Sequence, residues 1–89
     1  MEFEWDSNKA ATNFSKHGIT FSEAATVFGD PLEVTIADPD HSVEEFRFLS
    51  VGRSEAGRLL VVAYAERNNH IRIITARPVT PQEGRHYES

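Results

Sequence analysis

Leu59-Leu60-Val61-Val62-Ala63-Tyr64 is the stretch that decides the fold of this 89-residue chain. A run that is apolar almost throughout is typical of a central strand whose two faces are both covered. Arg67-Asn68-Asn69 then has the composition of a hairpin turn, and Ile71 to Arg77 is predicted to form the last strand, which Pro78 ends. The sequence therefore predicts an antiparallel pair of strands at the centre of a sheet.

Further strands are expected upstream of this pair. Leu32 to Ile36 alternates apolar and polar residues, as a half-buried strand does. Phe46 to Val51 is predicted to form the next strand, and Gly52 to Gly57 the turn that leads into the central one. Phe3 to Trp5 is long enough for a short first strand.

The first predicted helix runs from Lys9 to Lys16, after a cap at Asp6 or Ser7, and Gly18 ends it. The spacing of its residues places three of them on one face, which should pack against the sheet: Ala10, Phe14 and His17. For His17, the packed position competes with a role in proton transfer.

Two capping boxes mark the other helices. Thr20-Phe21-Ser22-Glu23 begins a second helix, which should end at Gly29-Asp30-Pro31. Thr80-Pro81-Gln82-Glu83 begins a third, so close to the chain end that it must dock on the rest of the molecule. The predicted fold is a single α+β domain over residues 1–89. It has a short N-terminal strand, two helices, a four-stranded antiparallel meander and a short C-terminal helix.

Composition excludes several classes of protein. The chain has no cysteine, which excludes disulfides, thiol catalysis and thiolate metal sites. Its N-terminus, Met1-Glu2-Phe3-Glu4, is acidic where a signal peptide needs basic and then apolar residues. The longest apolar run, Leu59 to Ala65, is too short to span a bilayer. We therefore expect a cytoplasmic protein that does not enter a membrane.

Positive charge is distributed unevenly along the chain. All seven arginines lie at or beyond Arg47, and both lysines lie at or before Lys16. Residues 1–46 have a net charge of −8 (two Lys, ten Asp and Glu), and residues 47–89 a net charge of +3 (seven Arg, four Glu). Arginine binds phosphate and carboxylate groups through two parallel hydrogen bonds. The pattern indicates a specific anion site or a charged partner, unless the arginines pair with the protein's own acids.

An ordered set of motifs covers Phe3 to Glu88. It comprises Phe3-Glu4-Trp5-Asp6, Lys9, Asn13, Lys16-His17-Gly18, Phe21-Ser22-Glu23-Ala24, Val27-Phe28-Gly29-Asp30-Pro31, Asp38-Pro39-Asp40-His41-Ser42, Glu44, Arg47, Gly52-Arg53-Ser54, Arg58-Leu59-Leu60-Val61-Val62, Ile71-Arg72-Ile73-Ile74-Thr75-Ala76-Arg77, Thr80, Glu83, Arg85 and Tyr87-Glu88. Together, in this order and at these spacings, the motifs resemble the BrnT-type toxin family.

The resemblance implies a RelE-like fold and a toxin of a type II toxin–antitoxin pair. Such a toxin is a ribonuclease that inhibits translation and uses no cofactor. It also implies neutralisation by a BrnA-type ribbon-helix-helix antitoxin, so that DNA is contacted only indirectly, through the antitoxin.

Cleavage of RNA without a metal needs a group to deprotonate a ribose 2′-hydroxyl, cations around the phosphate and an acid for the leaving oxygen. The candidate catalytic residues in the matching motifs are His41, Glu44, Arg72, Arg77 and Tyr87. The candidate RNA-binding residues are Lys9, Lys16, Arg47 and Arg85. Because Arg72 and Arg77 are five residues apart, a regular strand would point them to opposite faces, unless Pro78 marks a distortion.

Structural roles compete with several of these assignments. Glu44 and Arg47 are three residues apart and can pair with each other, and Tyr87 can either position a base or cover the sheet. Trp5 is expected in the core. A cluster of four residues could hold a hard cation, but its spacing matches no calcium loop or two-histidine zinc site, so we expect an acid-rich turn and no metal: Asp38, Asp40, His41 and Glu44.

A second function, a partner-binding module without catalysis that still docks an antitoxin, is motivated by the acidic character of the chain (pI about 5.2) and by its small core. Pro78-Val79 also stands where the family pattern leads us to expect a basic residue and alanine. Gly84 lies inside the last predicted helix, at a cost of about 1 kcal/mol relative to alanine. Direct DNA binding by this chain alone is not expected, because it has no basic recognition helix.

Overall fold

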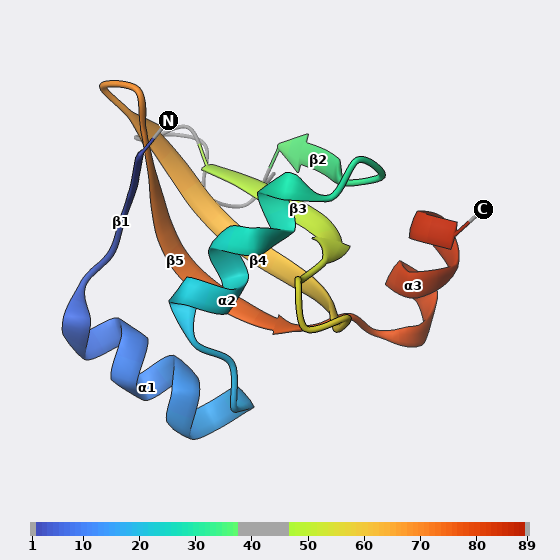
Figure 1. The fold of residues 1–89 in the computed structure, drawn as a ribbon, viewed down its shortest axis with the longest axis horizontal. Helices are drawn as coiled ribbons and strands as arrows, with labels where there is room; N and C mark the ends of the chain where they lie inside the picture. The colour runs from blue at the N-terminus through green and yellow to red at the C-terminus, as the bar shows by residue number, and fades with distance from the viewer. Residues whose placement is uncertain (1, 38–46, 89) are drawn as a thin grey trace.

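The described part of the chain forms a five-stranded sheet with helices on both faces (Figure 1). The computed structural model describes residues 2–37 and 47–88. Its elements are β1 (Glu2–Glu4), α1 (Ser7–His17), α2 (Phe21–Thr26), the 3₁₀ helix η1 (Val27–Gly29), β2 (Val34–Ala37), β3 (Arg47–Arg53), β4 (Leu59–Arg67), β5 (His70–Pro78) and α3 (Pro81–Glu88). No helix in these two ranges is long and apolar enough to cross a membrane.

The sheet has the strand order β1-β5-β4-β3-β2 and is mixed. Strands β2 to β5 are antiparallel neighbours. The predicted α+β class is confirmed, but the four-stranded meander is not the whole sheet, because β1 joins it parallel to β5. The register of this added strand places Glu4 beside Arg72, and the two side chains form an ion pair. β1 therefore covers part of an edge that would otherwise be exposed.

The central hairpin follows the sequence prediction. Asn68 and Asn69 both have positive φ angles, 49° and 67°. Two such residues are typical of the type I′ turn, whose twist matches that of antiparallel strands. The turn joins β4 and β5, which pair with each other from Arg67 opposite His70 to Leu60 opposite Pro78.

A β-bulge interrupts this pairing at Ile74. Ala63 lies opposite Thr75, whereas the next residue of β4, Tyr64, lies opposite Ile73. Ile74 is thus an extra residue in β5, and it reverses the alternation of side chains beyond it. The distortion proposed at Pro78 therefore lies four residues earlier.

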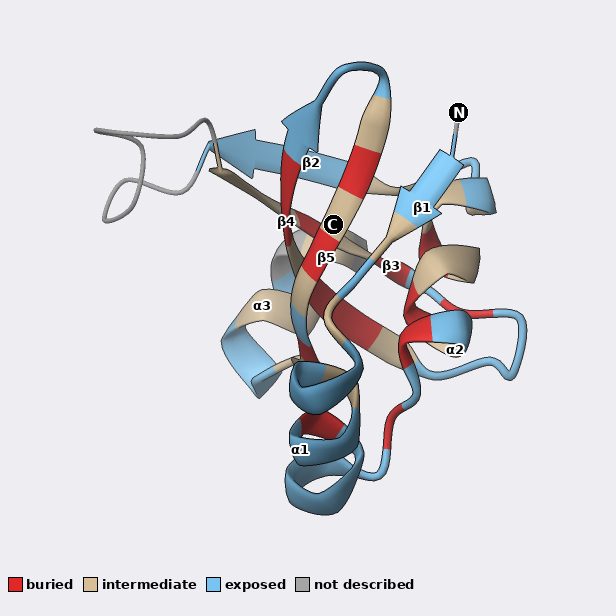
Figure 2. Ribbon diagram, turned by 90° about the vertical axis from the view of Figure 1, so that its left-hand side faces the viewer, coloured by how far each residue is buried: buried red, intermediate tan, exposed pale blue. Residues whose placement is uncertain are grey.

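The core fills the space between the sheet and the two N-terminal helices. Figure 2 shows α2 and α3 on opposite sides of the sheet. The buried cluster contains residues from the loop before α2, from α2, from η1 and from one face of the central strands: Ile19, Phe21, Ala24, Val27, Leu60, Val62, Tyr64, Ile71, Ile73 and Ala76. Trp5, expected in the core, lies at its exposed rim and packs edge-to-face against Phe21.

Helix α1 packs on the sheet through a face that shares only Ala10 with the one expected. Phe14 is 55% exposed and His17 is exposed, whereas Asn13 is buried. The Asn13 amide donates to the Ala76 carbonyl (2.9 Å) and to the Ile19 carbonyl (3.1 Å), and its oxygen accepts from the Ala76 N–H (3.0 Å). β1 pairs with β5 only at residues 70–72, so the edge of β5 at Ala76 lacks a strand partner there. One side chain supplies that partner, which is why a polar residue is buried.

The predicted caps of α1 are confirmed. Asp6 accepts a hydrogen bond from the Asn8 N–H (3.0 Å), and Gly18 ends the helix in the left-handed conformation (φ 68°). The second helical segment ends at Gly29 as predicted, but its last turn is the 3₁₀ helix η1 and Gly29 has no positive φ.

Strand β2 is an exposed edge strand rather than a half-buried one. All four of its residues are exposed, and Val34 and Ile36 are 45% and 51% exposed. The prediction of burial was wrong because β2 pairs on one side only, with β3.

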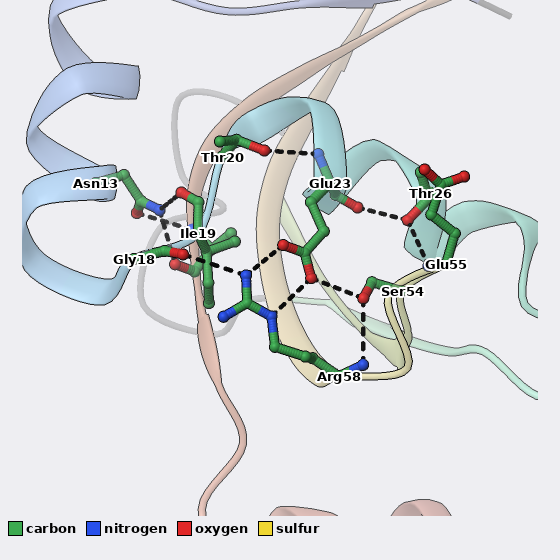
Figure 3. A network of polar contacts seen from close by, with 10 residues as sticks. Asn13, Gly18, Ile19, Thr20, Glu23, Thr26, Ser54, Glu55 and Arg58 are labelled. Atoms are coloured by element: carbon green, nitrogen blue, oxygen red, sulfur yellow. Dashed lines mark hydrogen bonds and ion pairs between the residues drawn. The ribbon is translucent and has the colours of Figure 1, made fainter.

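An ionic network joins the turn between β3 and β4 to the N-terminal helices (Figure 3). Arg58 Nε donates to Glu23 Oε2 (2.8 Å), a second guanidinium nitrogen of Arg58 pairs with Oε1, and Ser54 also donates to Glu23 Oε2 (2.8 Å). Arg58 Nη2 further donates to the Gly18 carbonyl (3.1 Å). The hydrogen bonds from Arg58 are the main cause of the lowered pKa of Glu23. Thr20 caps the Glu23 N–H as predicted, but the Glu23 carboxylate serves this network.

We expect Asn13→Ala to lower the free energy of unfolding by about 2–4 kcal/mol, because it leaves buried backbone groups of Ala76 and Ile19 without partners. Urea unfolding followed by circular dichroism measures this change. Asn8→Ala, an exposed change on the same helix, is the matched control and should remain within about 0.5 kcal/mol of wild type. Equal stability of the two variants would contradict a structural role for the Asn13 amide.

Candidate functional site

The face of the sheet opposite α1 and α2 collects the predicted arginines. Residues that lie opposite each other on neighbouring strands share a face. Three cross-strand rows can be followed on it: Arg47, Ala65 and Arg72; Leu49, Ala63 and Thr75; and Val51, Val61 and Arg77. We call this surface the open face. Because of the bulge at Ile74, Arg72 and Arg77 lie on the same face, and the prediction of opposite faces was wrong.

The cross-strand rows give the distance between Arg72 and Arg77 across the site. Arg72 and Arg77 lie opposite Ala65 and Val61, which are four residues apart on β4. Four residues of a strand span ~13 Å. The two guanidinium groups can therefore contact different groups of one extended ligand, and Arg47 and Arg72 flank Ala65 at one end.

Arg72 is held by an acid of the N-terminal strand. Its Nη1 donates to Glu4 Oε2 at 2.8 Å, and both side chains are partly exposed. An ion pair of this kind contributes little stability, because water screens it. It does restrict where the guanidinium group lies before any ligand arrives.

Arg77 is held more firmly, by the first turn of α3. Its two terminal nitrogens donate to the two oxygens of Glu83, each at 2.9 Å. Glu83 also accepts from the Thr80 N–H (2.8 Å), and Thr80 caps the Glu83 N–H (3.2 Å), which completes the predicted capping box. The hydrogen bonds from Arg77 are the main reason that the pKa of Glu83 falls to about 2.

Tyr87 is bound to an acid at the end of η1. Its hydroxyl donates to Asp30 Oδ2, which also accepts from the Arg53 N–H (2.7 Å), and Asp30 Oδ1 accepts from the Leu32 N–H (2.9 Å). The hydrogen bond to Asp30 raises the pKa of Tyr87 and lowers that of Asp30. A hydroxyl in this state is a hydrogen-bond donor and a poor base.

Helix α3 therefore lies against the open face through two polar contacts, Arg77–Glu83 and Asp30–Tyr87. Beneath it is a small apolar cavity of about 100 Å³, lined by Val34, Ile36, Leu49, Val51, Val61, Glu83 and Tyr87. The prediction that this short helix must dock is confirmed, since its Tyr87 covers part of the sheet.

The remaining predicted cations fall into two groups. Arg47 is half-buried at the start of β3, and Arg85 is exposed on α3. Lys9 and Lys16 are exposed on α1, beside the outer edge of β5, so they do not lie on the open face. Within residues 2–37 and 47–88, these four cations make no ion pair.

His41 and Glu44 lie outside the described residues, as does the acid-rich segment from Asp38 to Glu44. Among the described residues, no group of three His, Asp or Glu side chains is placed to hold a metal ion. His17, expected to pack, is exposed at the end of α1.

Three acids of the site escaped the sequence reasoning: Glu4, Asp30 and Glu83. Glu83 carried a signal, because it is the last residue of a capping box six residues after Arg77. Nothing in the sequence marked Glu4 or Asp30 as a site residue. Glu4 lies 68 residues from Arg72 and Asp30 lies 57 residues from Tyr87, so only the fold brings each pair together.

The stability that the Arg77–Glu83 pair contributes to the fold should depend on pH. The folded pKa of Glu83 is about 2 and therefore lies below its unfolded value. The stabilisation is thus complete above about pH 5 and is lost as the pH falls towards 2. Arg77 and Glu83 are 39% and 31% exposed, so we expect only about 1 kcal/mol.

The variant Glu83→Gln, which keeps the capping box, tests this pH dependence. At pH 7 this variant should unfold about 1 kcal/mol more easily than wild type. The difference should disappear near pH 2 when both are measured by urea unfolding. A difference that does not depend on pH would show that the charge of Glu83 is not what stabilises the pair.

Comparisons with known proteins agree with this architecture. The family model described as "Ribonuclease toxin, BrnT, of type II toxin-antitoxin system" matches residues 5–83. A crystal structure of the Brucella abortus ribonuclease toxin BrnT is similar, with a TM-score of 0.66 and 19% sequence identity, over 90% of this chain and 97% of that one. At this identity the likeness establishes the fold. No curated relative matches the sequence. Because the family model spans most of its length, the chain belongs to the BrnT family of ribonuclease toxins of type II toxin–antitoxin systems.

Proposed function

We propose that this protein is a metal-independent endoribonuclease of RelE-like fold that inhibits translation by cleaving RNA on the open face of its sheet. The observation that supports this most is the placement of Arg47, Arg72 and Arg77 on one face. Planar guanidinium groups suit phosphate, and they stabilise the charge that develops when a phosphodiester is attacked.

In this proposal Arg72 and Arg77 surround the scissile phosphate and its neighbour, and Arg47 and Arg85 bind the flanking backbone. Tyr87 positions the RNA through its aromatic ring, since its single hydroxyl proton is already donated to Asp30. His41 and Glu44 remain the candidates for proton transfer that the sequence suggests. Among the described residues, His70 lies two residues before Arg72 on the same face of β5, where its Nε2 is 2.8 Å from Glu2 Oε2. The 2′-hydroxyl attacks the adjacent phosphorus, its proton passes to the base, and the 5′-oxygen leaves with a proton from the acid.

The acids of the open face have a part in this proposal. Glu4 and Glu83 hold Arg72 and Arg77 before RNA binds. Ordering a free arginine costs about 2 kcal/mol of rotamer entropy, so an arginine that is already ordered loses less when phosphate binds. The phosphate must nevertheless displace or share each carboxylate.

A type II toxin has an antitoxin as its partner. We propose that the antitoxin is of the BrnA ribbon-helix-helix type and that it alone contacts DNA. The acidic N-terminal half, with a net charge of −8 over residues 1–46, would repel DNA phosphates from much of this chain.

A second candidate function is a partner-binding module without catalysis. It is favoured by one observation: Arg72, Arg77 and Tyr87 are each bound to an acid of the chain itself. In that case the three contacts are structural, and activity would be absent.

The pair Arg72→Gln and Glu4→Gln distinguishes the two functions. Both changes remove the same ion pair, but only the first removes the cation. If Arg72 binds phosphate, Arg72→Gln should lower the rate of RNA cleavage by about 100-fold or more. Glu4→Gln should change the rate far less, because Arg72 is retained: the ordering by Glu4 is lost, but so is the competition between its carboxylate and the phosphate.

Cleavage of labelled RNA by purified toxin and growth arrest on induced expression provide the two measurements. Thermal unfolding of both variants controls for loss of structure, and similar small changes are expected because the pair is partly exposed. Equal loss of cleavage in both variants would assign the pair a structural role. Absence of cleavage in folded wild type would favour the binding module.

A further inference from the structure

A groove lies between α1 and β5, away from the open face. It measures about 340 Å³, and its lining includes Lys9, Thr12, Lys16 and His17 from α1 and Ile74 and Thr75 from β5. Every charged or titratable side chain in this lining is a cation or a histidine. We call it the α1–β5 groove.

The groove exists because two contacts cover the edge of β5 and leave a gap between them. β1 pairs with residues 70–72, and the Asn13 amide pairs with Ala76. The bulged residue Ile74 and its neighbour Thr75 lie in the gap. Asn13 is buried and holds α1 against this edge, so the groove has a fixed wall and is not a chance gap between mobile segments.

The charge of the groove stands out against the rest of the chain. Residues 1–46 contain ten acids, yet residues 7–22 contain none. Arg58, Arg72 and Arg77 pair with Glu23, Glu4 and Glu83. Lys9 and Lys16, in contrast, have no acidic partner among the described residues. A protein with a net charge of −5 thus keeps one helix free of acids and leaves both of its lysines available.

The groove is continuous with the open face. Thr75 lines it, and the same residue lies in the middle row of the open face, opposite Ala63 and between the rows of Arg72 and Arg77. A strand of RNA that crosses the open face towards β5 would therefore reach the groove at Thr75. Figure 2 shows α1 immediately below β5.

We propose that the α1–β5 groove binds the sugar–phosphate backbone of the RNA beyond the cleavage site. Lys9 and Lys16 are seven residues apart on one helix, hence about 10 Å apart along its axis. That separation is too large for a single phosphate, so the two lysines contact two different ones. His17 donates a hydrogen bond to the same backbone, whereas the Thr12 hydroxyl donates to the Asn8 carbonyl (3.0 Å) and only lines the groove. The inference rests on the proposed ribonuclease function and adds to it the path of the substrate.

The test is the salt dependence of binding to an RNA that cannot be cleaved. A fluorescent single-stranded 2′-O-methyl RNA of about 12 nucleotides suits it, because it lacks the attacking 2′-hydroxyl. The variant Lys9→Gln/Lys16→Gln removes both cations. Leu32→Glu/Ala56→Glu changes the net charge by the same two units at exposed positions outside the groove and serves as the matched control.

Loss of two phosphate contacts should reduce the slope of log K against log salt by about 1.4. The control should keep the wild-type slope. Thr12→Glu, which keeps both lysines but puts a carboxylate in the groove, should also weaken binding. Circular dichroism and thermal unfolding verify that each variant is folded.

Equal slopes for wild type, the lysine variant and the control would overturn the proposal. So would an unchanged slope combined with loss of antitoxin affinity, which would assign the lysines to the protein partner. Failure of the proposed function looks different: wild type would bind the analogue with the steeper slope, yet leave unmodified RNA intact.

Discussion

The extra residue at Ile74 in β5 determines the chemistry of the whole sheet. Without it, the alternation of a regular strand would send either Arg72 or Arg77 to the face that packs against α1 and α2. A guanidinium group without a partner in that apolar layer would be costly. The bulge is fixed on both sides, by β1 at residues 70–72 and by the Asn13 amide at Ala76. The register of β5 therefore cannot slip without breaking buried hydrogen bonds.

The same arrangement explains why a short helix can hold its position at the end of the chain. α3 has eight residues and a glycine in its middle, so it would not be stable alone. Glu83 ties its first turn to Arg77, and Tyr87 ties its last turn to Asp30. Because Asp30 also accepts the Arg53 N–H, the contact joins α3, η1 and β3. Arg77 and Tyr87, which the sequence predicted to be catalytic, thus also support the fold. Only a substitution that removes the charge and keeps the structure can distinguish the two roles.

Local signals in the sequence were sufficient to predict most helices and strands, but they did not predict which face of each element is buried. The Asn68-Asn69 turn, the Asp6 and Thr20 caps and the apolar run of β4 each act through neighbouring residues, so the sequence predicted them. The parallel pairing of β1, the bulge at Ile74 and the burial of Asn13 depend on contacts between distant segments. The site shows the same division: its residue types were predictable, whereas the shared face of Arg72 and Arg77 and the pairing of Arg72 with Glu4 were not.

Net charge is a weak argument against RNA binding in a protein of this design. Electrostatic interactions in water extend only about 8 Å at physiological ionic strength, so RNA responds to the charges closest to it. Here acids near the open face are paired with side chains of the same face: Glu4 with Arg72, Glu83 with Arg77 and Glu2 with His70. The α1–β5 groove, with Lys9 and Lys16, has no acid in its lining. A chain with a pI of about 5.2 can therefore offer RNA two cationic surfaces, joined at Thr75. We therefore expect RNA to bind along the open face and the α1–β5 groove, without a general attraction of the protein to nucleic acid.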